Sequence, residues 1–247
     1  MSVILKRFIL SVKVFLKKYF YCDSELTKDI FFILRKLNLE KPIFIDVGAY
    51  KGLWISKYLK KIPKIKAYML EPHKPSFIQL KKKFRTFKNV SIFQYGLSDI
   101  SGIKDVNVNI QTYTNSFLDL DPEASKSWKS TKFEHLYKES VQIYSLEDFV
   151  KNNNIEKINV LKLDVQGLEF KVLEGSKKLL KKGFIDVLVL EMIVAPTYKN
   201  QSKISDIFQI LENNDYKLYG IYDIEKKPKR EKIQQFDVIF YNSELNL

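Results

Sequence analysis

The residues with the clearest potential for chemistry are a glycine turn and two carboxylates near it. Asp46, Gly48 and Gly52 lie at the end of the apolar run 43–47, and Glu71 follows the next apolar run. In an open α/β sheet, ligands bind beyond the carboxyl ends of the parallel strands, where glycine allows a close backbone approach. A carboxylate about twenty residues further on can accept hydrogen bonds from both hydroxyls of a ribose. The spacing therefore predicts a nucleoside site over these strand ends.

The turn lacks the signatures of phosphate binding. No glycine lies at the position where a pyrophosphate approaches a dinucleotide fold, and no Gly-Lys-Ser or Gly-Lys-Thr follows. These features favour S-adenosylmethionine, which contains a nucleoside without a phosphate. Its amino-acid part would lie on the turn, and its ammonium would approach Asp46. We expect the turn contacts to come from Gly48, Ala49, Tyr50 and Gly52. An ordinary strand-to-helix turn is the alternative.

Two further carboxylates close later apolar runs. Asp164 ends the run 158–164, and Glu191 ends the run 184–191. If both runs are parallel strands, the two carboxylates face one cleft. Asp164 is then a candidate catalytic base or an orienting group for a hydroxyl acceptor, and the pair could share one proton or bind a divalent cation. Alternatively, both carboxylates only hold loops and cofactor.

For other polar residues near these strand ends, the sequence gives weaker evidence of a role in catalysis or binding. Lys162 shares a strand face with Asp164, and an internal lysine usually needs an acidic partner, so we expect an ion pair. His73 follows Glu71 and is a second candidate base. The pair Asn115-Ser116 could contact cofactor or substrate, or lie in an ordinary loop.

The composition limits the partners and the cofactors. The chain has 247 residues and a net charge of +13, which favours phosphorylated substrates, lipid headgroups or nucleic acid. A single cysteine, Cys22, and two histidines exclude an intrachain disulfide and a Cys/His zinc site. We expect a cytoplasmic protein.

The first twenty residues form a distinct basic segment. No uncharged run there approaches the roughly 20 residues needed to cross a bilayer. A helical arrangement gathers its apolar side chains on one face with lysines beside them, which predicts a helix on an anionic membrane surface, at the inner face of the membrane. The alternatives are a helix packed on the domain and a helix that pairs in a homodimer.

The elements that position these residues alternate between strand and helix. We expect strands at 43–47, 66–71, 90–95, 158–164 and 184–191, and helices at 51–60, 74–85, 169–181 and 201–214. This alternation predicts a parallel sheet in an α/β domain spanning 41–247. A second helix, capped by Asp23 or Ser24 and ending near Leu39, would complete an N-terminal helical extension over 1–40.

Two segments depart from the alternation. Strands 216–222 and 236–241 are joined by a polar linker without an apolar helical face, so we expect an antiparallel hairpin. Residues 104–110 alternate as an edge strand does, 111–140 are expected to be an irregular substrate-side insertion, and 141–144 form a short strand. Ser145 then begins a helix with a capping box.

Four stretches together resemble the FkbM family of S-adenosylmethionine-dependent methyltransferases. They are IDVGAYKG at 45–52, LEP at 70–72, GLSD at 96–99 with Gly102, and KLDVQGLE at 162–169 with VLEG at 172–175. The resemblance covers residues 40 to 195. The family usually has glutamate where this chain has Gln166, so a charge-dependent role at that position is not carried over.

The resemblance implies a class I methyltransferase fold, a Rossmann-like sheet of seven strands, mostly parallel, whose last strand is antiparallel. It also implies that Glu71 and Pro72 meet the ribose and that Ser98 and Asp99 flank the adenine; a simple Ser-Asp turn is the alternative. The implied activity is O-methylation of a sugar or glycan in polysaccharide biosynthesis, on a nucleotide-linked or lipid-linked carbohydrate.

Two other functions remain open at this point. The net charge suits an RNA methyltransferase, but adenine-N6 enzymes have Asn-Pro-Pro-Tyr where this chain has Asp164-Val165-Gln166-Gly167, which disfavours nucleic acid. The third possibility is a non-catalytic, membrane-associated protein that retains the fold.

Overall fold

The computed structural model describes residues 24–128, 131–226, 232–245 and 247. The chain divides into two units, Met1–Asn38 and Leu39–Leu247. The described part of the first unit is helix α2, Glu25–Lys36. The Ser24 hydroxyl accepts a hydrogen bond from the Thr27 amide at 3.3 Å, which confirms the expected cap. The expected helix over residues 1–20 lies outside the described residues.

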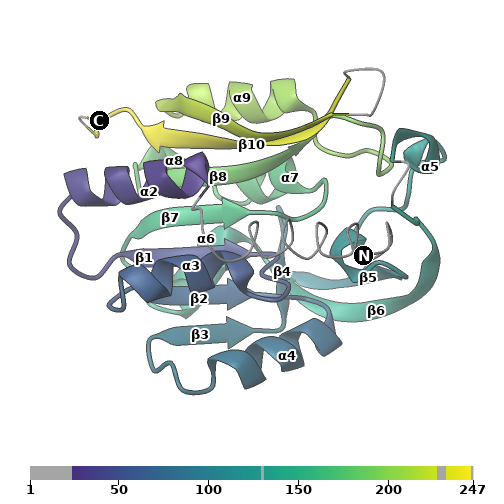
Figure 1. The fold of residues 1–247 in the computed structure, drawn as a ribbon, viewed down its shortest axis with the longest axis horizontal. Coiled ribbons are helices and arrows are strands. Elements are labelled where there is room, and N and C mark those ends of the chain that lie inside the picture. Colours follow the sequence, from purple (N-terminus) through teal and green to yellow (C-terminus); the bar gives the residue numbers. More distant parts are fainter. Residues whose placement is uncertain (1–23, 129–130, 227–231, 246) are drawn as a thin grey trace, which may run out of the picture. The chain divides into compact units, whose positions relative to one another are not determined.

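A seven-stranded sheet organises the second unit (Figure 1). Its strands, in spatial order, are β3 (Val90–Phe93), β2 (Lys66–Leu70), β1 (Ile43–Val47), β7 (Ile158–Leu163), β8 (Ile185–Ile193), β10 (Ile233–Asn242) and β9 (Tyr216–Lys226). The first five are parallel, whereas β10 is antiparallel to both of its neighbours. This confirms the expected seven-stranded α/β sheet with an antiparallel last strand.

Helices cover both faces of the sheet, which is why its central strands are apolar on both sides. On one face, Phe44 of β1 contacts the rings of Trp54 and Tyr58 from α3. Successive strand residues point to opposite faces, and on the other face Tyr68 of β2 contacts Phe149 of α6. The first face carries α3 (Leu53–Lys61) and α4 (Lys74–Phe84). The core of the second face is completed by α6 (Leu146–Asn152), α7 (Glu169–Glu174), α8 (Lys177–Lys181) and α9 (Ile204–Glu212).

A smaller, three-stranded sheet differs from what we expected for residues 90–95 and 111–140. Its order is β4 (Tyr95–Leu97), β6 (His135–Tyr144), β5 (Gly102–Asn109). The expected strand 90–95 ends at Phe93, because Tyr95 already pairs with β6. The expected irregular segment 111–140 is wrong at its end, where residues 135–140 pair with the edge strand β5. The segment also holds a short 3-10 helix, η1 (Thr112–Thr114), and α5 (Ala124–Ser127).

The expected helix 169–181 is interrupted between α7 and α8. A Cβ at Gly175 would lie 2.3 Å from the carbonyl oxygen of Ser98, so the chain approaches the 96–99 turn too closely for a larger residue. This contact ties the end of α7 to the turn after β4. None of the helices in the described ranges combines the length and apolar character that crossing a membrane requires.

Candidate active site

The glycine turn joins the ends of three strands. The amides of Gly48 and Ala49 both donate to the carbonyl of Leu70, the last residue of β2, at 3.0 Å. Gly48 has a φ of +78°, which favours glycine, and a Cβ there would lie 1.9 Å from the backbone oxygen of Asp164. The turn therefore brings the ends of β1, β2 and β7 together, and only glycine fits.

Glu71 lies beside this turn and is buried, with 6% of its surface exposed. Its Oε2 accepts a hydrogen bond from the Tyr50 amide at 2.7 Å, and its Oε1 accepts one from the His73 amide at 3.0 Å. Burial raises the pKa of its carboxyl to about 7, against these two hydrogen bonds, which lower it. Each carboxylate oxygen has a second lone pair, so Glu71 can still accept hydrogen bonds from a ligand.

Asp46 is a buried carboxylate without a hydrogen-bond donor among the described residues. Its nearest cation is the Lys162 ammonium, at 4.0 Å from Oδ1. Burial raises the pKa of Asp46 to about 6, although Lys162 lowers it. A buried carboxylate with unfilled acceptor positions suits a cationic or hydrogen-bonding ligand group.

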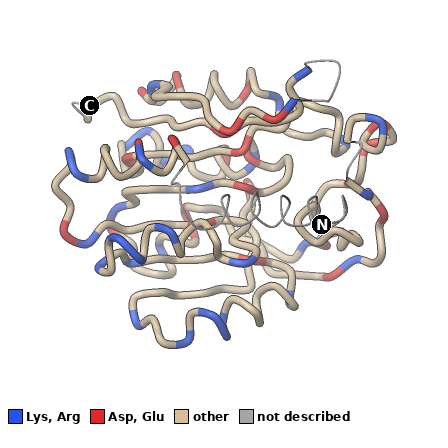
Figure 2. The backbone as a smooth tube through the Cα atoms, viewed as in Figure 1, with Lys and Arg blue, Asp and Glu red and all other residues tan. Residues whose placement is uncertain are grey.

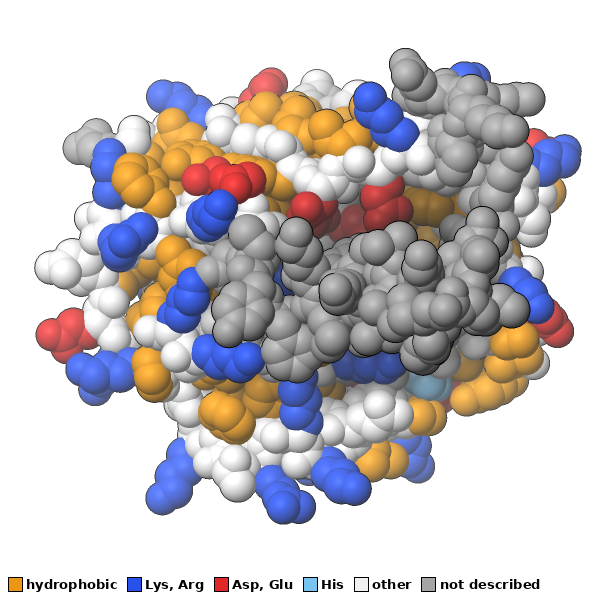
Figure 3. Space-filling model, in the orientation of Figure 1, with side chains coloured by type: hydrophobic (Ala, Val, Ile, Leu, Met, Phe, Trp, Pro, Cys, Tyr) orange, Lys and Arg blue, Asp and Glu red, His pale blue; other side chains and the backbone are white. Residues whose placement is uncertain are grey.

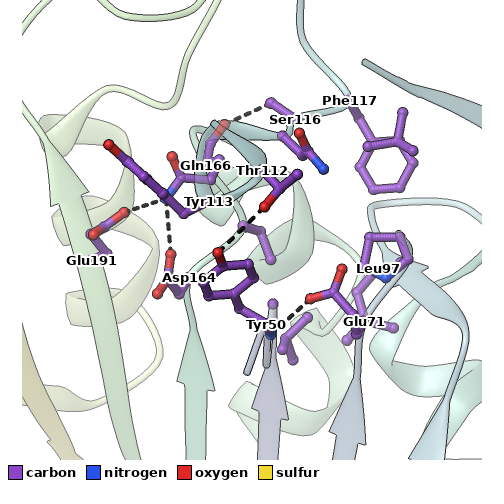
Figure 4. Close-up of a pocket in the computed structure, with 17 residues that line it drawn as sticks. Tyr50, Glu71, Leu97, Thr112, Tyr113, Ser116, Phe117, Asp164, Gln166 and Glu191 are labelled. Atoms are coloured by element: carbon purple, nitrogen blue, oxygen red, sulfur yellow. Dashed lines mark hydrogen bonds between the residues drawn. The ribbon is translucent and has the colours of Figure 1, made fainter. Parts of the chain in front are cut away.

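The two predicted catalytic carboxylates meet through an amide (Figure 4). The Nε2 of Gln166 donates to Asp164 Oδ1 at 2.9 Å and to Glu191 Oε2 at 2.7 Å. On its other side, the Oε1 of Gln166 accepts from the Tyr198 hydroxyl at 2.8 Å. The amide orientation is therefore set by one donor on one side and two carboxylates on the other. Gln166 has a left-handed backbone, with φ +53°, and its carbonyl accepts from Ser116 Oγ at 2.7 Å.

The environment separates the proton affinities of the two carboxylates. Burial would raise the pKa of Asp164, but the Lys162 ammonium at 2.8 Å and the hydrogen bonds of its neighbours hold it below the usual value. Burial, and next the charge of Asp164, raise the pKa of Glu191 well above its ordinary value. Asp164 is therefore the member of the pair that ionises first, and Glu191 is the member that holds its proton more tightly.

These groups line one cavity. Figure 4 shows Glu71, Leu97 and Phe117 on one side, Asp164, Gln166 and Glu191 on the other, and Tyr50 between them. Tyr113 also lines the cavity, and Thr112 Oγ1 is 3.3 Å from the Tyr50 hydroxyl. The complete lining is Val47, Gly48, Tyr50, Glu71, Pro72, Gly96, Leu97, Val106, Thr112, Tyr113, Asn115, Ser116, Phe117, Asp164, Val165, Gln166 and Glu191.

Some residues expected at the cofactor lie outside this lining: Asp46, Ala49, Gly52, Ser98 and Asp99. Ser98 donates from Oγ to Asp99 Oδ1 at 2.9 Å, and Asp99 forms an ion pair with Lys171 at 3.1 Å. Here Leu97, rather than Ser98 or Asp99, faces the cavity from the turn after β4.

The weaker sequence signals have different outcomes. The expected ion pair of Lys162 is confirmed, since its ammonium lies 2.8 Å from Asp164 Oδ2. His73 is buried, its Nδ1 lies 3.0 Å from Ser76 Oγ, and it is not part of the cavity lining. Asn115 and Ser116 do line the cavity, and Asn115 Oδ1 accepts from the Asn109 amide at 2.8 Å.

Sequence reasoning missed three residues around the acid pair. Tyr113 and Tyr198 come from segments without a regular pattern, so no sequence signal placed them here. Asp237 of β10 is paired in register with Glu191, and burial raises its pKa to about 7. An acid inside the apolar run 236–241 was the available signal for it.

The described residues contain no group of three or more histidine, cysteine, aspartate or glutamate side chains arranged to hold a metal ion.

Comparison with known proteins decides the family. The sequence model of the methyltransferase FkbM domain matches residues 46–218, which is most of the chain. The chain belongs to the FkbM methyltransferase family. The match contains the glycine turn, Glu71, the acid pair and Gln166, so the cavity lies within the family domain.

One curated relative matches a shorter region. The 2-O-methyltransferase NoeI of Sinorhizobium fredii is 23% identical over 156 residues, which cover 61% of this chain. The matched region spans 63% of that relative, less than two thirds of its length.

Two solved structures match most of the chain at low sequence identity. An S-adenosylmethionine-dependent methyltransferase from Clostridium acetobutylicum has a TM-score of 0.44 at 10% identity, covering 95% of this chain and 98% of its own. An rRNA methylase from Streptococcus thermophilus has a TM-score of 0.45 at 11% identity, covering 90% and 98%. Because both scores lie below 0.5, the fold assignment is based on the strand order and the family match.

Proposed function

We propose that this protein transfers a methyl group from S-adenosylmethionine to a hydroxyl of a sugar or glycan. The observation that carries the proposal is one cavity with the Gly48 turn and Glu71 on one side and the Asp164–Gln166–Glu191 group on the other. The first side suits a ribose, and the second suits a hydroxyl acceptor.

The residues present fit the cofactor. Glu71 accepts hydrogen bonds from both ribose hydroxyls, because each of its carboxylate oxygens has a lone pair that the backbone amides do not use. Leu97 and Phe117 offer apolar surfaces to the adenine on the same side of the cavity (Figure 4). The turn at Gly48 holds the amino-acid part, and the buried carboxylate of Asp46, which has no hydrogen-bond donor among the described residues, favours its ammonium.

Proton transfer is assigned to Asp164. When bound, S-adenosylmethionine supplies an electrophilic methyl group: its sulfur–carbon bond breaks, a carbon–oxygen bond forms, and a neutral thioether leaves. The hydroxyl must lose its proton in this exchange, and the ionised Asp164 carboxylate accepts it. Lys162 keeps that carboxylate ionised, and Gln166 fixes its direction. Glu191, holding a proton, can donate a hydrogen bond to an acceptor oxygen.

A carbohydrate acceptor is supported by the chemistry of the cavity wall and by the relative. The wall near Asp164 combines carboxyl, amide and hydroxyl groups with the half-exposed ring of Tyr113, the combination that binds sugar hydroxyls and sugar ring faces. The curated relative is described as a 2-O-methyltransferase.

Two measurements test the proposal. Isothermal titration of the full chain with S-adenosylmethionine and with S-adenosylhomocysteine should give saturable heat, and heat with neither would overturn it. Incubation with methyl-labelled S-adenosylmethionine and a panel of sugar nucleotides and oligosaccharides should give labelled sugar. Transfer to RNA but to no carbohydrate would overturn the acceptor class alone.

A further inference from the structure

The positive charge of this chain is concentrated in one segment. Residues 51–90 contain eleven lysines, one arginine and a single acid, so they contribute +11 of the net +13. That acid is Glu71, which is buried and bonded to backbone amides. The remaining residues together carry +2, because acids elsewhere offset the basic residues of 1–20.

Most of these cations lie on helices α3 and α4, which cover one face of the sheet. Lys83 of α4 donates from Nζ to the carbonyl of Lys51 at 2.8 Å and lies 3.2 Å from that of Gly52, where α3 begins. Lys60 of α3 is close enough to contribute to a lowered pKa of Lys83, after the larger effect of burial. The two helices therefore lie side by side. Figure 2 shows their Lys and Arg positions in the lower half of the view, where Figure 3 shows many basic side chains on the surface. The exposed cations of the segment are Lys51, Lys57, Lys60, Lys61, Lys64, Lys66, Lys74, Lys81, Lys82, Lys83, Arg85 and Lys88.

Apolar side chains are exposed among these cations. Leu53 at the start of α3 is 46% exposed, Ile78 of α4 is 54% exposed, and Phe87 after α4 is 42% exposed. Exposed apolar residues within a lysine-rich face are the combination found on surfaces that lie at a membrane interface.

We propose that the face formed by α3, α4 and the turn after α4, called here the basic face, docks on an anionic lipid bilayer. The lysine ammonium groups attract the negatively charged phosphate headgroups, and the exposed apolar side chains enter the headgroup region. Nucleic-acid surfaces instead favour arginine forks and several stacking aromatics, whereas this face has one arginine, Arg85, and one exposed aromatic, Phe87.

Two cations of the 51–90 segment lie next to residues that line the candidate active site. Lys51 directly follows Tyr50, and Lys74 lies two residues after Pro72; both Tyr50 and Pro72 line the cavity. A docked bilayer would thus lie next to the cavity. If the proposed function holds, this position favours an acceptor sugar that is carried on a lipid; docking itself does not depend on that function.

Vesicle co-sedimentation of the full chain tests the proposal. The wild-type protein should bind vesicles of phosphatidylcholine mixed with phosphatidylglycerol and dissociate from them as the salt concentration rises. It should not bind vesicles of phosphatidylcholine alone. The triple variant K60Q/K81Q/K82Q removes three exposed cations and should weaken vesicle binding by on the order of 100-fold. The control K177Q/K181Q/K182Q removes the same charge from exposed positions around α8 and should change binding by less than about threefold.

Three outcomes would overturn docking through this face. They are binding by the triple variant equal to wild type, equal losses in the two variants, and wild-type binding to RNA at salt concentrations that release it from vesicles. Far-ultraviolet circular dichroism of both variants reports their folding without any ligand. Because vesicle binding uses no cofactor, failure of membrane docking and failure of the proposed function give separate results.

Discussion

Replacement of Glu71 by glutamine removes the charge that we assign to ribose binding. The carboxylate has two equivalent oxygens, one facing the Tyr50 amide at 2.7 Å and one facing the His73 amide at 3.0 Å. A glutamine has one carbonyl oxygen and one NH₂ group, so one backbone donor would face another donor. The E71Q variant therefore loses an acceptor for the ligand and part of its own support.

The size of the effect follows from hydrogen-bond energetics. A hydrogen bond to a charged group contributes about 1.5–3 kcal/mol, so loss of one should raise the Kd by about 10-fold to 150-fold. The wild type should also depend on pH. The pKa of Glu71 is raised to about 7, so about a tenth of it is ionised at pH 6 and about nine tenths at pH 8. Binding of hydroxyl donors to the ionised form should tighten the Kd about tenfold over that range.

Isothermal titration with S-adenosylhomocysteine at pH 6, 7 and 8 measures both effects. The matched control is E169Q, since burial also raises the pKa of Glu169 to about 7 but its carboxylate is not part of the cavity lining. E71Q should bind weakly at every pH, and E169Q should retain the affinity and pH profile of wild type. Wild-type affinity in E71Q, or equal losses in the two variants, would refute the assignment of Glu71 to the ribose.

The remaining predictions concern catalysis, the turn and stability. D164N should lower kcat by about 10²-fold to 10⁴-fold in the methyl-transfer assay while cofactor affinity changes little, because it removes the proton acceptor; an unchanged kcat would exclude Asp164 as the base. G48A should abolish cofactor binding, since its Cβ would lie 1.9 Å from a backbone oxygen; wild-type affinity in G48A would contradict the need for close approach at Gly48. The folded-state pKa of Glu169 exceeds its unfolded value of 4.5, so its stabilising contribution is present below pH 4.5 and lost as pH rises through about 7. In urea unfolding, wild type should therefore lose about 3 kcal/mol more stability than E169Q between pH 4.5 and 8; parallel pH profiles would contradict the raised pKa.

The sequence was sufficient for the parts of the fold that depend on local patterns. Continuous apolar runs predicted the parallel strands, and the polar linker after residue 222 predicted the antiparallel hairpin of β9 and β10. Glycine and acid spacing also placed Gly48, Glu71 and Asp164 in one cavity, because parallel strands end at the same edge.

Contacts between distant segments could not be predicted in this way. Residues 135–140 of β6 are exposed except for the partly buried Glu139, and they pair with the edge strand β5, so burial imposed no apolar pattern on them. The break between α7 and α8 depends on the approach of Gly175 to Ser98, which only the folded chain brings together. The bridging amide of Gln166 depends likewise on Tyr198, a residue 32 positions away.

A crystal structure of the full chain with S-adenosylhomocysteine tests the central claim most directly. We predict electron density for the nucleoside in the cavity, with both ribose hydroxyls about 3 Å from the Glu71 carboxylate and the sulfur directed toward Asp164. A nucleoside bound elsewhere, or one whose ribose leaves Glu71 in contact only with the Tyr50 and His73 amides, would contradict it.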